Sequence, residues 1–201
     1  KTSPEAQKII QREHSLIQKL RAGHKVVYAP VRELKMAALR AAFDWFYDNE
    51  FKRSTPRAAE FMEFQKNTRW LYTYSAFRCL KDVHGWSSWT TWHRDLRSCK
   101  ADAVARFRLH HEKDVLFYEY LQWIAAKQWA RVRQTARDNG IWLFGDLPFM
   151  VNQESPDVWA NQKTFDISTE VGAPPDYFNP EGQRWGLPAY SWHGLEKSKF
   201  A

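Results

Sequence analysis

Four carboxylates in the last third of the chain are the first candidates for chemistry. Asp146, Glu154, Asp157 and Asp176 lie among Gly, Pro and aromatic residues. Cleavage of a glycosidic bond needs two carboxyl groups that flank it, about 5 Å apart in retaining enzymes. Sequence spacing does not place any two of the four as such a pair. The Ser-Pro step between Glu154 and Asp157 instead predicts that these two mark the start of a helix.

Asp146 follows the short apolar run Ile141–Phe144, which itself follows an Asn-Gly turn. Such a run is typical of a strand buried on both faces of a parallel sheet. In β/α barrels a helix is followed by a tight turn, a buried strand and a polar strand tip. Functional groups lie at these carboxyl ends of the strands. Spacing alone leaves four roles open for Asp146: acid or base, metal ligand, orienter of an Arg or a hydroxyl group, and cap of the next turn.

Residue types that bind metals or take part in redox chemistry form no recognisable motif. His84, His110 and His111 lie in or at the ends of predicted helices, without the spacing of a metal site, so we interpret them as surface or packing residues. Cys79 and Cys99 belong to no C-x-x-C motif. We therefore expect neither a bound metal nor a cofactor.

The amino-acid composition is that of an ordinary globular chain that is rich in tryptophan. The 201 residues include 30 Lys+Arg against 23 Asp+Glu, for a net charge of +7, but the charges are interleaved. A solvated helical surface is therefore favoured over a nucleic-acid interface. No signal peptide or membrane-spanning run is visible, so we expect a cytoplasmic protein. The 11 Trp residues fit either core packing or a cleft whose flat rings stack on sugars.

Helices must position most of these residues. Apolar residues recur at three and four positions across the first two-thirds of the chain, which is the helical period. Trp86, Trp89 and Trp92 interrupt this pattern among Ser and Thr, and we interpret them as packing residues of a loop. The chain after Pro148 is predicted to be a long irregular loop, kept ordered by its aromatic residues. The predicted helices are Ser3 to Gly23, Pro30 to Phe46, Thr55 to Phe64, Trp70 to His84, and about 101 to 138.

Two long motifs carry a family resemblance. GDLPFMVNQESPDVWA and GAPPDYFNPEGQRWGLPAY closely resemble the amylomaltase or disproportionating-enzyme family, the 4-α-glucanotransferases of glycoside hydrolase family 77. The segments SPEAQKIIQREHSLIQKL and LQWIAAKQWARVRQTARDNGI resemble that family's helical subdomain and the helix before a barrel strand. The resemblance extends to about Trp192. The tail HGLEKSKFA departs from the family pattern. At its start, Ser191-Trp192-His193 stands where the family usually has Arg-Trp-Asp.

The resemblance implies an α/β fold class, a partial (β/α)8 TIM barrel with a large, mainly helical insertion subdomain. Residues 1–100 would form that subdomain, 101–150 a helix plus a barrel strand ending at Asp146, and 151–201 the active-site lid loop. The implied activity is retaining transfer of an α-1,4-glucan segment to another glucan or to glucose. Implied substrates are maltooligosaccharides, amylose and glycogen-derived dextrins, with no cofactor, nucleic acid or membrane partner.

The resemblance also implies roles for individual residues. Asp146 matches the strand-tip Asp that orients an Arg and the nucleophile of a later strand. Asp176, Tyr177 and Phe178 would contact bound glucan, the two rings by stacking, and Trp185 would lie near the reacting sugar. Anchoring of the loop is the alternative role for Tyr177 and Phe178, and packing is the alternative for Trp185. A lid of this kind excludes water and so favours transfer over hydrolysis.

The nucleophile Asp, the acid/base Glu and a second sugar-binding Asp of this family follow the lid, on later strands. The chain stops before them, so we interpret it as an internal fragment of a longer enzyme that is inactive alone. A non-catalytic α-glucan-binding module is the second hypothesis. A related α-glucan hydrolase and a basic helical nucleic-acid or scaffold protein are further alternatives. Only the lid motif separates the hydrolase from the transferase, and only the charge of +7 suggests the last one.

Overall fold

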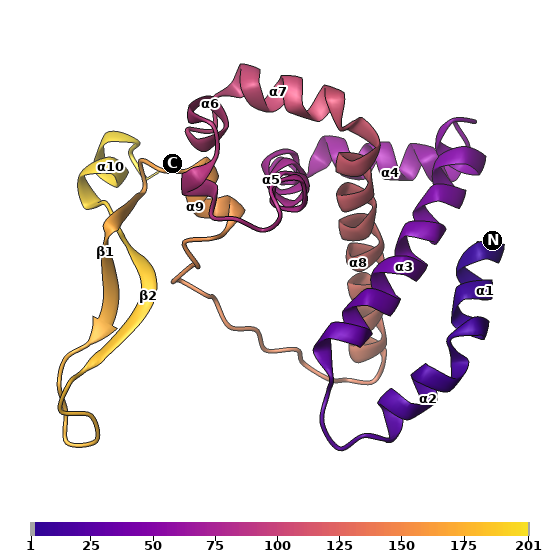
Figure 1. The fold of residues 1–201 in the computed structure, drawn as a ribbon, viewed down its shortest axis with the longest axis horizontal. Coiled ribbons are helices and arrows are strands. Elements are labelled where there is room, and N and C mark those ends of the chain that lie inside the picture. Colours follow the sequence, from indigo (N-terminus) through magenta and orange to yellow (C-terminus); the bar gives the residue numbers. More distant parts are fainter. Residues whose placement is uncertain (1–2, 201) are drawn as a thin grey trace. The chain divides into compact units, whose positions relative to one another are not determined.

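The computed structural model describes residues 3–200, which form two compact units. One unit runs to Arg69 and takes in Glu119–Ala130. The other comprises Trp70–Tyr118 and the chain from Arg131 onward. The long helix α8 (Glu112–Asp138) contributes residues to both units, and Figure 1 shows the elements in chain order.

Helices make up the first unit and most of the second. The first unit contains α1 (Pro4–Arg12), α2 (His14–Ala22), α3 (Tyr28–Phe46), the π-helical turn η1 (Tyr47–Phe51), α4 (Pro56–Asn67) and the middle of α8. The second contains α5 (Leu71–Val83), the 3₁₀ turn η2 (Trp89–Thr91), α6 (Arg94–Arg97), α7 (Ala101–His110), α9 (Pro156–Ala160), strands β1 (Phe165–Ala173) and β2 (Gln183–Tyr190), and α10 (Trp192–Lys197). No helix among residues 3–200 combines the length and apolar character needed to cross a bilayer.

Hydroxyl caps start three of the helices as the sequence predicts. Ser3 accepts a hydrogen bond from Ala6 N–H at 3.2 Å, and Ser155 accepts one from Val158 N–H at the same distance. Thr55 caps α4 in the same manner. Each cap is followed by a proline, whose missing N–H would have no partner in the first helical turn anyway. The predicted helix start between Glu154 and Asp157 is thereby confirmed.

Two predicted helices are broken in the structure. The helix expected from Ser3 to Gly23 divides at Glu13, whose backbone turns out of helical geometry (φ −90°, ψ 14°). The helix expected over 101–138 divides at His111 (φ −117°, ψ 30°). Apolar periodicity continues across both breaks, so it could not reveal them. Helix α3 begins at Tyr28, and Pro30 is accommodated in its first turn.

Aromatic rings fill the core of the first unit. Phe46 is central: its ring centroid lies 4.9 Å from Tyr120 and 5.6 Å from Phe61, the latter edge-on. Trp123 contacts Phe46 and Phe61 at 5.5 Å each. The Arg57 guanidinium lies over the Phe46 and Trp123 rings. Because α3, α4 and α8 each supply rings, this core joins segments far apart in the sequence.

Tryptophans form the core of the second unit. The Trp92 and Trp159 rings meet edge-on at 5.9 Å, and Phe77 lies 5.6 Å from Trp159. Trp89 and Trp92 are buried, which confirms their interpretation as packing residues. The same interpretation is wrong for Trp86, which stays 48% exposed. Positive φ angles at Gly85 and Trp86 turn the chain at the end of α5 and leave this ring outside the core.

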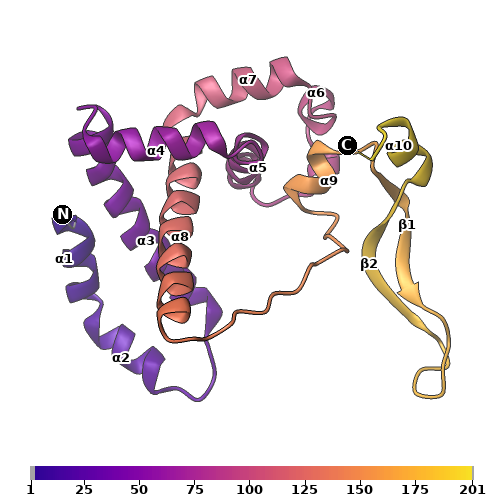
Figure 2. The ribbon, with the colours of Figure 1, turned by 180° about the vertical axis from the view of Figure 1, so that it is seen from behind.

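The strand predicted over Ile141–Phe144 is not formed. Ile141 to Phe149 is extended, but within the described chain the only two strands pair with each other. In Figures 1 and 2 this segment runs between α8 and α9 with no strand arrow. An extended segment becomes a strand only through hydrogen bonds to a neighbour, and composition cannot supply that neighbour.

The prediction of an irregular loop after Pro148 is wrong for most of its length, because β1 and β2 form a hairpin there between the short helices α9 and α10. β1 and β2 pair antiparallel from Phe165↔Tyr190 to Ala173↔Gln183, with irregularities after Asp166 and after Val171. Phe165, Ile167 and Val171 alternate with polar residues, a strand signal that the Pro and Gly content obscured. At Gly172 an added Cβ would lie 2.0 Å from the Gln183 carbonyl oxygen, so the close approach of the strands requires glycine.

Candidate functional site

The tip of the β1–β2 hairpin presents two aromatic rings to solvent. Tyr177 is 93% exposed and Phe178 is 91% exposed. Their ring centroids lie 5.4 Å apart and the planes are nearly perpendicular, at 89°. Two adjacent exposed rings on a turn form an apolar surface that the protein itself does not cover. Such a surface is suited to contact with a ligand.

Asp176 shapes this tip. One carboxylate oxygen accepts hydrogen bonds from the N–H groups of Phe178, at 2.9 Å, and Asn179, at 2.7 Å. The Asp176 N–H donates to the Asn179 carbonyl oxygen at 3.0 Å. A side chain that satisfies backbone donors in this way makes an Asx turn. The carboxylate therefore fixes the backbone that carries both rings, while contact of Asp176 with a sugar stays a prediction.

Gly182 closes the hairpin loop. Its φ is +70°, and an added Cβ would lie 2.7 Å from the Ala173 carbonyl oxygen. Its N–H donates to the Asn179 carbonyl oxygen at 3.0 Å. A side chain would therefore be strained here both by backbone conformation and by contact. The loop that displays Tyr177 and Phe178 is consequently held in a defined shape.

Trp185 lies on β2, in the stem of the same hairpin. Its indole N–H donates to the Gln183 side-chain oxygen at 3.0 Å, and its ring is partly exposed. Beside it, Glu170 on β1 accepts a hydrogen bond from Gly186 N–H at 2.9 Å and pairs with Arg184. The structure thus brings Trp185, Tyr177 and Phe178 onto one hairpin.

The base of the hairpin is attached to the end of the extended segment. The Tyr190 hydroxyl donates to the Phe149 carbonyl oxygen, and the Tyr190 ring packs 5.2 Å from the Phe165 ring. Ser191 N–H donates to the Thr164 carbonyl oxygen at 2.9 Å. Ser191 also caps α10, so the divergent Ser191-Trp192-His193 sequence starts a short helix. These contacts fix the base of the hairpin within the second unit.

A buried lysine, Lys81, forms an ion pair with the partly exposed Glu154 just before α9. The Lys81 ammonium donates to Glu154 at 2.8 Å, to the Ser87 carbonyl at 2.7 Å and to the Trp86 carbonyl at 3.3 Å. All three ammonium protons therefore have partners, as a buried lysine requires. Ser88 donates to the other Glu154 oxygen. Sequence reasoning did not find this pair; its only signal was a lysine next to the apolar positions Phe77 and Leu80 of α5.

The pKa of Glu154 is held below its ordinary value. Burial alone would raise this pKa, but hydrogen bonds from Lys81 and Ser88, the positive charge of Lys81 and the Trp89 N–H together outweigh burial. The carboxylate is therefore ionised at neutral pH and acts as a structural anchor. The indole N–H of Trp89 adds a bond to the Gln153 carbonyl at 2.7 Å.

Two further hydrogen bonds attach α9 and the residues just after it to α6. The Trp159 indole N–H donates to the Leu96 carbonyl at 2.8 Å, and the Gln162 amide donates to the Arg97 carbonyl at 2.7 Å. Trp159 itself is fully buried. The segment between the extended run and the hairpin is thus fixed to the helical part of the second unit.

Asp146 is exposed and lies away from these contacts. Over the described part of the chain no hydrogen bond or ion pair of Asp146 is recorded, and none connects it with Tyr177, Phe178 or Trp185. The neighbouring side chains of Trp142 and Phe144 are almost entirely exposed. The structure therefore does not bring Asp146 together with the hairpin residues. Residues 3–200 also hold no cluster of three His, Cys, Asp or Glu side chains placed to bind a metal.

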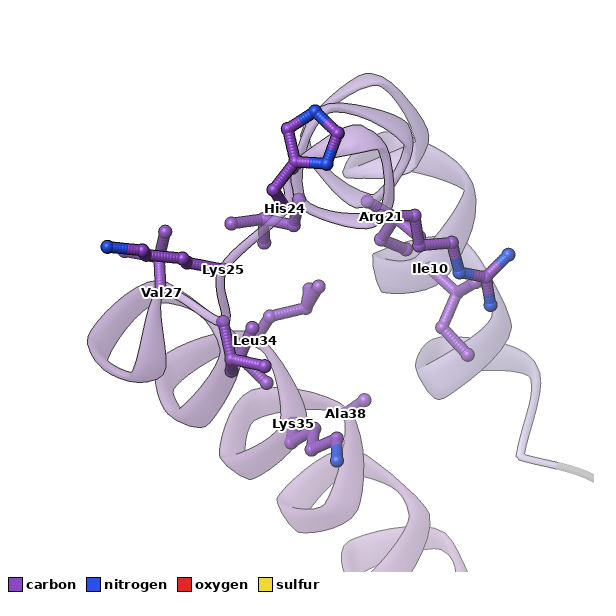
Figure 3. A pocket seen from close by; sticks show the side chains of 13 residues that line it. Ile10, Arg21, His24, Lys25, Val27, Leu34, Lys35 and Ala38 are labelled. Carbon is purple, nitrogen blue, oxygen red and sulfur yellow. The ribbon is translucent and has the colours of Figure 1, made fainter.

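An apolar groove lies in the first unit, between α1, α2 and α3. Its volume is about 610 Å³, and Figure 3 shows Ile10, Leu34 and Ala38 inside it with Arg21 and Lys35 at its rim. None of the residues lining it is a carboxylate, and none is a predicted site residue. Glycosidic bond cleavage needs carboxyl groups, so this groove does not qualify as an active site.

Comparison with protein-family models decides the assignment. The model for 4-alpha-glucanotransferase, glycoside hydrolase family 77, matches residues 2–201. The chain belongs to this family. The resemblance expected from the GDLPFM and PPDYFN motifs is confirmed.

Curated relatives agree with this 4-alpha-glucanotransferase assignment. The chain is 35% identical over 201 residues to a 4-alpha-glucanotransferase of Chlamydia pneumoniae, covering 99% of this chain and 36% of that protein. It is 33% identical to the enzymes of Synechocystis sp. and Thermus thermophilus, covering 88% of this chain and 36% of each protein. The chain thus spans about a third of the length of these relatives.

Solved amylomaltase structures share the fold. An amylomaltase from Streptococcus agalactiae in complex with acarbose superposes with a TM-score of 0.80 at 24% identity, covering 97% of this chain and 41% of that one. An amylomaltase from Corynebacterium glutamicum gives a TM-score of 0.63 at 23% identity, covering 85% of this chain and 22% of that one. The fold of this family-77 chain is therefore that of the corresponding part of an amylomaltase.

Proposed function

We propose that this chain is part of a retaining 4-alpha-glucanotransferase, which moves an α-1,4-glucan segment to another glucan or to glucose. Family membership supports the reaction class. The observation that carries the proposal is the hairpin tip, where a hydrogen-bonded Asx turn displays Tyr177 and Phe178, each more than nine-tenths exposed. The substrates would be maltooligosaccharides, amylose and glycogen-derived dextrins, in the cytoplasm.

The hairpin would act as a lid over bound glucan. Flat rings suit the apolar faces of pyranose sugars, and the Asx turn at Asp176 fixes their position in advance. Trp185 would contact sugar from the hairpin stem. A lid that excludes water from a glycosyl-enzyme leaves a glucan hydroxyl group as the preferred acceptor, so the lid would favour transfer over hydrolysis.

We place the nucleophile and the acid/base outside this chain. Ile141–Phe149 would serve as a barrel strand, because Trp142 and Phe144, together with Leu143, expose apolar side chains on both faces, as a central parallel strand requires. Asp146 would then stand at the strand tip and orient catalytic groups of later strands. Residues 1–100 would form the helical insertion, 101–150 the helix and strand, and 151–201 the lid region.

A non-catalytic α-glucan-binding module is the second candidate. It is supported by the way the hairpin base is held within its own unit: Tyr190 bonds the Phe149 carbonyl and Ser191 bonds the Thr164 carbonyl. In the preceding α9, Trp159 bonds the Leu96 carbonyl of α6. Such a module would bind glucan without turnover. The two candidates therefore differ in activity and agree on the hairpin as the binding element.

Maltotriose turnover and maltoheptaose binding test the proposal together. The chain alone should release no glucose from maltotriose, and it should bind maltoheptaose in isothermal titration. The Tyr177→Ala/Phe178→Ala variant should bind about tenfold more weakly, since each stacking contact contributes on the order of 1 kcal/mol. Tyr28→Ala, which removes another well-exposed aromatic ring, is the matched control and should bind normally. Unchanged affinity of the hairpin variant would contradict the proposed role of the tip.

A further inference from the structure

Three aromatic side chains and one arginine lie in a row along the surface of α5. Trp70 at the start of α5, Tyr74, Arg78 and the Trp86 ring beyond its end form what we call the α5 strip. Trp70 and Tyr74 are one helical turn apart, and their ring centroids lie 5.6 Å apart, edge to face. The Arg78 guanidinium, one turn further on, lies 4.5 Å from the centroid of the Trp86 ring.

Trp86 is held outward by its backbone and its side chain together. Its φ is +63°, a left-handed conformation that is strained for a bulky residue. Its N–H donates to the Lys81 carbonyl at 2.6 Å, and its indole N–H donates to Asp82 at 3.1 Å. Nevertheless 48% of the residue is exposed. A strained backbone that keeps a large ring in solvent indicates a functional rather than a packing role.

The neighbouring tryptophans show the contrast. Trp89 and Trp92 follow at three-residue intervals, and both are buried in the core of the second unit. Only the first member of the series is turned out to solvent, together with Trp70, which is 53% exposed. Two half-exposed indoles at the two ends of α5, with Tyr74 beside one of them, form more apolar area than a scattered surface residue does.

Charged groups border these rings. Arg78 lies between the Trp86 and Tyr118 rings, at 4.5 Å and 5.1 Å from their centroids. Asp82 accepts hydrogen bonds from the Trp86 indole and from the Tyr118 hydroxyl. A guanidinium and a carboxylate beside an exposed indole combine a flat apolar face with groups that can bond hydroxyls. This is the chemistry that recognises a sugar ring.

We propose that the α5 strip is a second α-glucan-binding site, distinct from the hairpin tip. The ligand class rests on the proposed function. From Trp70 to Arg78 the helix rises about 12 Å, at about 1.5 Å per residue. The strip is therefore longer than a single sugar ring and takes an oligosaccharide rather than glucose. Its role is to hold a glucan chain away from the reacting end.

Maltoheptaose binding in a hairpin-disabled background tests this site. The full chain carrying Tyr177→Ala/Phe178→Ala should keep measurable binding to maltoheptaose in isothermal titration, and glucose should not bind measurably. Adding Trp70→Ala and Trp86→Ala should weaken the remaining binding about tenfold or more. Trp129→Ala, which removes an indole that is 56% exposed on α8, should leave binding unchanged.

Trp86→Gly separates a binding role from a structural one. Glycine adopts positive φ without strain, so the variant should keep the unfolding temperature of the native chain while losing affinity. Trp86→Phe should restore part of the affinity. Equal affinity of the hairpin variant before and after Trp70→Ala and Trp86→Ala are added would overturn the second site. So would a hairpin variant without any residual binding, although that result would leave the proposed function standing. If Tyr177→Ala/Phe178→Ala caused no loss of affinity and only the added Trp70→Ala and Trp86→Ala did, the result would support the second site and refute binding at the hairpin.

Discussion

Hydrogen bonding of the indole N–H group distinguishes two buried tryptophans of the second unit. Trp89 and Trp92 are both buried, but their indole N–H groups differ. Trp89 donates to the Gln153 carbonyl at 2.7 Å. The Trp92 indole nitrogen has no hydrogen-bond partner among the described residues. Burial of a polar group is favourable only when it is hydrogen-bonded, so two similar side chains have different energetics.

We expect Trp92→Phe to cost less stability than Trp89→Phe. The first change removes an unpaired donor, whereas the second removes a paired donor and leaves the Gln153 carbonyl without it. The difference in the free energy of unfolding should be about 1–3 kcal/mol. Urea unfolding followed by circular dichroism measures it. Equal destabilisation would show that ring volume alone sets the cost.

The ion pair of Glu154 predicts a dependence of stability on pH. Burial opposes ionisation, but hydrogen bonds from Lys81 and Ser88 outweigh it, so the pKa of the folded carboxyl is below its ordinary value of 4.5. Because the folded pKa is lowered, the stabilisation is fully present above the unfolded pKa and is lost as pH falls through the folded pKa. Relative to Glu154→Gln, the native chain should lose its advantage as pH falls below about 4.5.

Urea unfolding of both proteins between pH 7 and pH 3 checks this pH dependence. The difference in free energy of unfolding should be constant near neutrality and shrink in acid. Asp48→Asn serves as the control, because its ion pair with Lys52 is solvent-exposed. A difference that stayed constant down to pH 3 would refute the linkage of stability to Glu154.

At the scale of elements, the β1–β2 hairpin depends on the helices beside it. A two-stranded ribbon alone is marginally stable in water. Here Trp159 packs against Phe77 and Trp92 and bonds the Leu96 carbonyl, while Tyr190 bonds the Phe149 carbonyl. The hairpin is therefore stabilised at its base, and its tip is free to meet a ligand.

Trp159→Ala should loosen the hairpin selectively. Truncation of a buried tryptophan typically costs about 3–5 kcal/mol, and here the lost contacts lie between α5, α6 and α9. Amide hydrogen exchange should accelerate in β1 and β2, while exchange in α3 of the other unit stays unchanged. Trp192→Ala, which removes an exposed ring at the start of α10, should have little effect. Equal acceleration in α3 would instead indicate global destabilisation.

At the scale of the whole molecule, the extended segment Ile141–Phe149 exposes a run of large apolar side chains. Trp142, Phe144 and Leu147 are largely exposed. None of these positions is paired in the two-stranded sheet. Exposed apolar side chains on an extended backbone favour pairing with another chain. The segment therefore has the properties of a strand edge that is available for pairing.

Phe144→Lys should make the isolated chain less prone to association. A charge on this segment opposes edge-to-edge pairing, so binding of the dye ANS should fall and the monomer fraction in analytical ultracentrifugation should rise. Far-ultraviolet circular dichroism should not change, because no helix contains this residue. Unchanged association would show that another surface, such as the groove of Figure 3, drives it.

Local signals in the sequence determined the family and most helices. The GDLPFM and PPDYFN motifs identified the 4-alpha-glucanotransferase family, and Ser3-Pro4, Thr55-Pro56 and Ser155-Pro156 marked helix starts. These inferences succeed because a cap or a motif involves residues within a few positions of one another. The exposure of Tyr177 and Phe178 is compatible with their predicted contact with glucan, which remains to be tested.

Only the tertiary structure decided which distant residues meet. Lys81 and Glu154 are 73 positions apart in the sequence, and the Trp159–Leu96 bond spans 63 positions. It also decided that Trp86 stays outside while Trp89 and Trp92 are buried, and that Ile141–Phe144 lacks a strand partner. Periodicity states which face of a segment is apolar, whereas pairing and burial depend on what other segments place against that face.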